Sequence, residues 1–145
     1  MTRPKATLLL LVLLAGLGWL VERLIVTDTE AIEALLDEAI EAGRARQLAP
    51  IRPHLSDDFA WQGRGPDAAL ADAQRLFDTY KPTLVDLRRG PIVVVAPRAE
   101  AEIDVRIVAM AGLYAGRLGL VLRKDDGTWR IVEASDLAPL PPGGG

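Results

Sequence analysis

The chain opens with one long apolar stretch and then changes to mixed patterns of apolar and polar residues. Residues 6–21 are apolar and rich in leucine, and residues 24–26 continue this character past Glu22 and Arg23. A helix rises about 1.5 Å per residue, so roughly 20 apolar residues cross a bilayer core of about 30 Å. The pattern predicts a signal anchor or transmembrane helix over residues 1–26, with residues 6–26 in contact with the lipid bilayer.

The charges around this stretch predict its orientation. Arg3 and Lys5 precede it, so the positive-inside bias keeps the N-terminus cytoplasmic and places the remaining chain outside the cytoplasm. We therefore expect a single-pass protein of the cell membrane. A cleaved signal peptide is the alternative, because Gly16 and Gly18 are small residues at a suitable spacing.

Beyond the apolar stretch, the pattern first has the period of helices. Apolar positions recur every three or four residues over 28–42, with Thr27 as a potential cap and Gly43 as a stop. A shorter helical piece is expected over residues 45–55, bent near its prolines. A further helix begins at Pro66, and its inner stripe consists of Leu70, Ala73, Leu76, Phe77 and Tyr80.

From residue 83 the period changes to two, which is typical of strands. After a short strand at 57–61, strands are predicted at 83–95, 99–110, 115–124 and 128–135. In the second of these four, alternate apolar residues should face inward while Glu102, Asp104 and Arg106 face outward. Gly90-Pro91 predicts a bulge, and Asp126-Gly127 predicts a tight hairpin.

This order of elements indicates an α+β domain over residues 27–136, in which about three helices pack on a curved antiparallel sheet. The Pro- and Gly-rich residues 137–145 have the composition of a disordered tail. The domain is large enough for a single hydrophobic core.

Composition narrows the chemistry. The net charge of −3 and pI near 5.2, with scattered basic residues, argue against binding of nucleic acid. The chain has no cysteine, which excludes disulfides and thiolate sites. His54 is its single histidine, so no metal and no cofactor is expected.

The order of elements resembles the nuclear transport factor 2-like superfamily, also called the SnoaL-like or cone fold. The similarity lies in residues 27–30 at the start of the first helix, residues 55–59 entering the first strand, and the closing hairpin at 125–131. The resemblance implies a half-open cone with an apolar pocket between helices and sheet, and often a homodimer formed through the outer face of the sheet. Members include isomerases, dehydratases, hydrolases, cyclases and binding modules without catalysis, so the fold does not choose among them.

The catalytic patterns of these enzymes are not matched here. The ketosteroid isomerases carry a basic aspartate at the end of the first strand, where this chain has Trp61-Gln62-Gly63. The dehydratase pattern needs two histidines. Asp104 and Arg106 could imitate part of the hydrolase network, but they lie on the polar face of their strand, where a cross-strand charge ladder is favoured. No catalytic residue is therefore assigned.

Five residues remain as candidates for a pocket. Trp61 and Tyr80 each combine an apolar body with a polar tip, Asp58 is expected at the pocket mouth, and His54 and Tyr114 complete the set. The favoured interpretation is non-catalytic binding of a small apolar ligand or a protein partner. The alternatives are an isomerase, dehydratase or cyclase acting on a hydrophobic small molecule, and a module for dimerisation or assembly.

Overall fold

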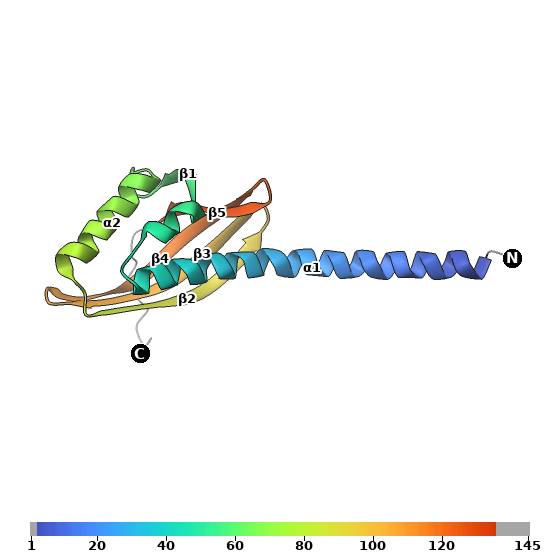
Figure 1. Ribbon diagram of the computed structural model, residues 1–145, viewed down its shortest axis with the longest axis horizontal. Coiled ribbons are helices and arrows are strands. Elements are labelled where there is room, and N and C mark those ends of the chain that lie inside the picture. Colours follow the sequence, from blue (N-terminus) through green and yellow to red (C-terminus); the bar gives the residue numbers. More distant parts are fainter. Residues whose placement is uncertain (1–2, 136–145) are drawn as a thin grey trace.

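The computed structural model describes the backbone of residues 3–135, and the side chains of residues 5–19 and 28–135. Its first element, α1, is one helix that runs from Arg3 to Arg44 without interruption and extends far from the rest of the domain (Figure 1). Its 42 residues correspond to about 63 Å of helix. The described side chains include no helical segment with both the length and the hydropathy needed to cross a bilayer.

The helix start predicted at Thr27 is wrong, because α1 passes through this position. The capping signal is overridden, since the preceding residues are themselves good helix formers and no breaker separates the two segments. The predicted stop near Gly43 is confirmed. The chain leaves the helix at Arg44, and Arg46 adopts a positive φ of 59° at the turn.

Two short helical elements follow α1, as the sequence predicts. The 3-10 helix η1 spans Ala49–His54, and the helix α2 spans Pro66–Tyr80 with its proline in the first turn. Proline is well suited to this position because its fixed φ fits the helix and its missing N–H would have no partner there. The described part of the chain thus has two α-helices and one 3-10 helix, in agreement with the expected number of about three.

A five-stranded sheet forms the other half of the domain. Its strands are β1 (Leu55–Ala60), β2 (Leu84–Val95), β3 (Arg98–Ala109), β4 (Gly112–Asp125) and β5 (Thr128–Ala134), in the spatial order β1-β5-β4-β3-β2. Strands β2 to β5 form the predicted antiparallel meander. The sheet as a whole is mixed rather than antiparallel, because β1 pairs in parallel with β5. This pairing follows from the chain path: β2 runs opposite to β1, and three reversals bring β5 back to the direction of β1.

The irregularities of the sheet fall where the sequence places them. The register between β2 and β3 shifts between Arg89 and Ile92, at the predicted bulge. Asp126 and Gly127 both have positive φ in the hairpin between β4 and β5. In β3 the alternate residues from Ala101 to Ala109 face the core, as predicted.

The helices and the inner face of the sheet enclose one apolar core. Ile32 and Leu36 of α1 and Leu122 of β4 are its most completely buried large side chains. The C-terminal part of α1 packs against β2, while α2 lies nearer to β1 and η1 (Figure 1). The two helices thus cover different parts of the sheet.

Candidate functional site

The space between the helices and the sheet is an apolar cavity of about 540 Å³. Its walls come from α1, η1, α2 and the inner faces of all five strands. The side of α2 that faces it is the stripe predicted from helical period, namely Leu70, Ala73, Leu76, Phe77 and Tyr80. The volume falls in the range of small-molecule sites, which is roughly 300–1,000 Å³.

The chemistry of the cavity wall is uniform. The described residues that line it are alanine, valine, isoleucine, leucine, phenylalanine, proline, glycine, tryptophan and tyrosine. Within this part of the chain, the lining includes no carboxylate, imidazole, ammonium or guanidinium group. Its polar side-chain atoms belong to Trp61, Tyr80 and Tyr114, which are three of the five residues singled out from the sequence.

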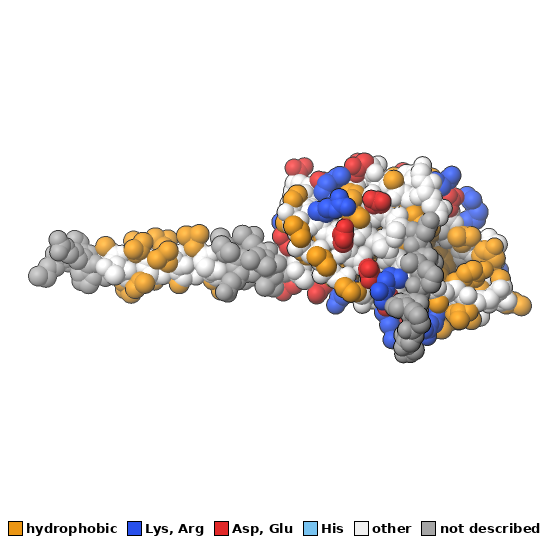
Figure 2. Space-filling view, turned by 180° about the vertical axis from the view of Figure 1, so that it is seen from behind, with side chains coloured by type: hydrophobic (Ala, Val, Ile, Leu, Met, Phe, Trp, Pro, Cys, Tyr) orange, Lys and Arg blue, Asp and Glu red, His pale blue; other side chains and the backbone are white. Residues whose placement is uncertain are grey.

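The three aromatic residues occupy different parts of the cavity. Tyr80 and Tyr114 are about half exposed, as is Leu76, and these residues mark the opening. Further exposed apolar residues lie nearby, at the start of β2, in the turn between β3 and β4, and at the start of β4: Leu84, Met110 and Leu113. Figure 2 shows apolar side chains gathered at the end of the domain that is remote from the N-terminal part of α1.

Trp61 lies in a tight turn at the end of β1. Its backbone N–H donates to the carbonyl of Arg64 at 3.0 Å, and the N–H of Arg64 donates back to the carbonyl of Trp61 at 2.9 Å. Gln62 and Gly63 between them both have positive φ. The indole Nε1 is buried and has no hydrogen-bond partner within the described part of the chain.

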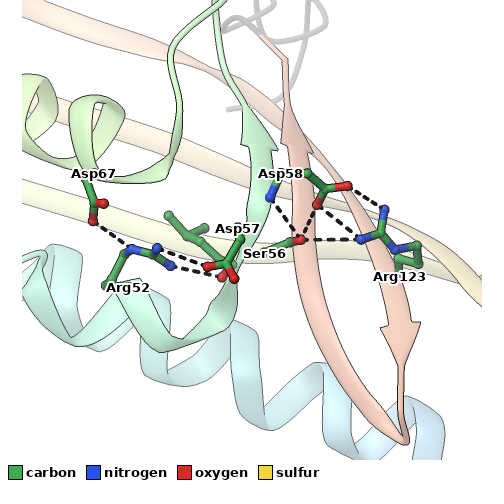
Figure 3. Close-up of polar contacts among 7 residues, drawn as sticks. Arg52, Ser56, Asp57, Asp58, Asp67 and Arg123 are labelled. Atoms are coloured by element: carbon green, nitrogen blue, oxygen red, sulfur yellow. Dashed lines mark hydrogen bonds and ion pairs between the residues drawn. The ribbon is translucent and has the colours of Figure 1, made fainter.

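Asp58 lies in a second hollow, a polar cleft of about 470 Å³ that also includes Arg52, Ser56 and Arg123. Figure 3 shows the contacts that close it. Arg123 reaches from β4 and donates to both carboxylate oxygens of Asp58, at 3.0 and 3.1 Å, and Ser56 donates to the same carboxylate. On the other side, Arg52 donates to Asp67 at 2.8 Å and to Asp57 at 3.3 Å.

These pairs fix the charge states in the polar cleft. The bonds from Arg123, and then from Ser56, lower the pKa of Asp58 to about 2. Hydrogen bonds to Asp125 first, and then to Asp58, raise the pKa of Arg123. A carboxylate with so low a pKa is a weak base at neutral pH, and a serine that donates to it is not activated as a nucleophile. In the cleft, Arg123 thus joins β4 to β1, and Arg52 joins η1 to β1 and α2.

His54 also lies outside the cavity lining. Its Nε2 is 2.5 Å from a carboxylate oxygen of Glu38 on α1, which ties the end of η1 to that helix. Asp58 and His54 therefore do not line the apolar cavity, and a role for them in ligand binding stays a prediction. Among the described residues, no group of three or more histidine, aspartate or glutamate side chains is arranged to hold a metal ion.

The predicted charge ladder on the outer face of the sheet is present. Arg117 of β4 bonds to Asp104 of β3 at 3.0 Å and pairs with Glu102 at 3.3 Å. Both carboxylates therefore lie on the face of the sheet opposite the cavity, as alternation along β3 predicted.

Sequence reasoning missed the polar cleft. Ser56 and Arg123 were not singled out, although Arg123 and Asp125 alternate on one strand face and so were a local signal of an ion pair. Their link to Asp58 joins positions 65 residues apart and depends on the unexpected parallel pairing of β1.

The comparisons with known proteins bear on the fold. No protein-family model matches the chain, and no curated protein matches it in sequence. An NTF2-like protein of unknown function from Pseudomonas putida KT2440 is 16% identical with a TM-score of 0.62, covering 81% of this chain and 91% of that one. A second, from Shewanella baltica OS155, is 22% identical with a TM-score of 0.59, covering 76% and 92%.

A third similar structure is Bd1075 of Bdellovibrio bacteriovorus, 12% identical with a TM-score of 0.64. The match covers 78% of this chain but 41% of that protein, which is therefore much longer. Identities this low bear on the fold rather than on activity. From the cone of helices on a curved sheet and these neighbours together, we conclude that the chain has the NTF2-like fold.

Proposed function

We propose that this chain is a membrane-tethered, extracytoplasmic domain that binds a small apolar ligand in its cavity without catalysing a reaction. The observation that carries the proposal is the composition of the cavity wall, which is apolar apart from three aromatic polar tips. Such a wall suits a hydrophobic molecule and offers no general base. In the polar cleft, Arg52 and Arg123 are instead paired with aspartates.

The tether is supported by the N-terminal part of α1. Its large apolar side chains from Leu8 to Trp19 are each more than half exposed, on a helix that extends away from the domain. A helix that is apolar on all sides is stable when surrounded by an apolar medium. The basic residues before it favour a cytoplasmic N-terminus. A homodimer through the outer face of the sheet belongs to the same proposal.

Native mass spectrometry of the full-length protein, purified from its own membrane, tests ligand binding and dimer formation together. We expect a mass increment from a co-purified small molecule. The variant Ala73→Trp places an indole in the cavity and should lose that increment. Ala71→Trp adds the same side chain on the exposed side of α2 and should retain it.

Two outcomes would contradict the proposal. A protein that carries no small molecule and takes up no apolar probe would exclude ligand binding. For the topology, a reporter fused after Gly145 that is active only outside the cytoplasm should give a signal, and silence would exclude export.

A further inference from the structure

Trp61 carries the one buried side-chain polar atom that lacks a hydrogen-bond partner among the described residues. Tyr80 and Tyr114 are about half exposed, so water reaches these side chains at the mouth. The indole Nε1 of Trp61 is instead shielded from solvent and donates to nothing in this part of the chain. We infer that Trp61 is the polar anchor of the cavity, and that the ligand is an uncharged molecule with a hydrogen-bond acceptor on an apolar body.

Another tryptophan shows what this group normally requires. Trp129 is buried, and its Nε1 donates to a carboxylate oxygen of Asp28 at 3.1 Å. Buried donors in folded proteins are almost always paired, because an unpaired one has lost its bond to water. An indole N–H donates and never accepts, so the missing partner must be an acceptor.

The backbone around Trp61 fixes its position. The two hydrogen bonds with Arg64 satisfy both its backbone N–H and its carbonyl, which leaves the side chain as its open group. These bonds hold the backbone of Trp61 in place, whereas the indole ring can still rotate about its side-chain bonds. Because Nε1 is buried in this structure, an acceptor in the cavity reaches it only after the indole ring turns.

The rest of the wall sets the class of ligand, and this step rests on the proposed function. A carboxylate or phosphate would lose its hydration in the cavity without meeting a cation, which is unfavourable. A pure hydrocarbon would leave the indole N–H unpaired. Ketones, esters and ethers with a medium-sized apolar body satisfy both conditions, and a cavity of about 540 Å³ accommodates them.

The test uses the full-length protein in lipid nanodiscs and three probes of one chain length: 2-nonanone, nonane and nonanoate. Methyl signals of the lining residues Ile103 and Ile107 report occupancy of the cavity by NMR, whichever probe enters. The indole N–H signal of Trp61 reports the hydrogen bond separately. Empty nanodiscs measure the fraction of each probe that the lipid takes up.

We expect 2-nonanone to bind roughly tenfold more tightly than nonane, as one hydrogen bond provides, and to shift the Trp61 indole signal downfield. Trp61→Phe should abolish this difference while still admitting both probes. Tyr114→Phe, which removes a hydroxyl at the mouth, should preserve it.

The outcomes separate this inference from the proposed function. If 2-nonanone and nonane both shift the methyl signals and bind with equal affinity, and Trp61→Phe changes neither affinity, Trp61 is not the polar anchor. Binding of apolar molecules in the cavity would still stand. Nonanoate binding as tightly as the ketone would overturn the uncharged class. No methyl shift with any probe would overturn the proposed function itself.

Discussion

The apolar cavity and the polar cleft have similar volumes, about 540 and 470 Å³, but opposite chemistry. The cavity is walled by aliphatic and aromatic side chains, whereas in the cleft Arg52 and Arg123 are paired with aspartates. The two hollows share Leu55, at the start of β1. The cleft holds the groups that could transfer protons, and the cavity holds the space for a hydrophobic molecule. The two sites adjoin at β1 but do not overlap. This separation favours ligand binding over catalysis.

The largest expected effect on stability comes from placing an ionisable side chain, like those of the cleft, in the wall of the apolar cavity. Ile103→Glu places a carboxyl in the apolar wall, where desolvation raises its pKa, in contrast to the lowered pKa of Asp58. We expect a loss of about 4 kcal/mol in the free energy of unfolding at pH 7. Because the carboxyl is neutral at low pH, the loss should become smaller as the pH falls toward 4. Urea unfolding at several pH values measures this.

Val93→Glu is the matched control for this variant. Val93 lies on the exposed face of β2, so a glutamate there remains hydrated and stability should change by less than about 0.5 kcal/mol. If Ile103→Glu were as stable as this control at pH 7, the cavity wall would be open to water and the contrast between the two hollows would disappear.

A smaller effect is expected from the one buried hydroxyl of the cleft. Ser56 is 5% exposed and its Oγ contacts both Asp58 and Arg123. Ser56→Ala removes these bonds and should cost about 1 kcal/mol in the free energy of unfolding. Ligand occupancy of the cavity, measured by native mass spectrometry, should stay at the wild-type level. A loss of ligand in this variant would show that the cleft takes part in binding.

The smallest effect concerns the exposed ion pair between Arg123 and Asp58. The pKa of Asp58 is about 2 in the folded protein and near 3.8 without its partners, so the pair stabilises the fold above pH 4. This contribution is lost as the pH falls from 4 toward 2. Arg123→Gln should be slightly less stable at pH 5 and should show a shallower decline over this acid range, measured by thermal unfolding.

Salt gives a second test of the same pair. Because both side chains are largely exposed, added salt should narrow the difference between wild type and Arg123→Gln. Arg98→Gln, at an exposed arginine 4.0 Å from Glu100, should keep the wild-type acid profile. An identical profile for all three proteins would mean that the bonds to Asp58 do not persist in solution.

Periodicity predicted those parts of the fold that depend on neighbours in sequence. The stripe from Leu70 to Tyr80 repeats every three or four residues and identified one cavity wall correctly. The alternation around Asp104 identified the outer face of the sheet. Both predictions succeeded because burial of one face imposes a local repeat on the sequence.

The parts that failed depend on contacts distant in sequence. Strand β1 has six residues, too few for a clear alternation, so its parallel pairing with β5 could not be inferred. Without that pairing, the contact between Asp58 and Arg123 has no sequence signal. The unpaired indole of Trp61 depends on which acceptors surround it in space, and no sequence pattern reports this.

The uninterrupted course of α1 has a mechanical consequence. Ala39, Ile40 and Gly43 form part of the cavity wall, and they belong to the same helix as the exposed leucines near its beginning. Since α1 is one continuous helix between these two ends, we expect a change of tilt or rotation at one end to be transmitted to the other. If the N-terminal part of α1 lies in a bilayer as proposed, ligand binding in the cavity should change the tilt of α1 in the membrane, and a change of tilt should change ligand affinity.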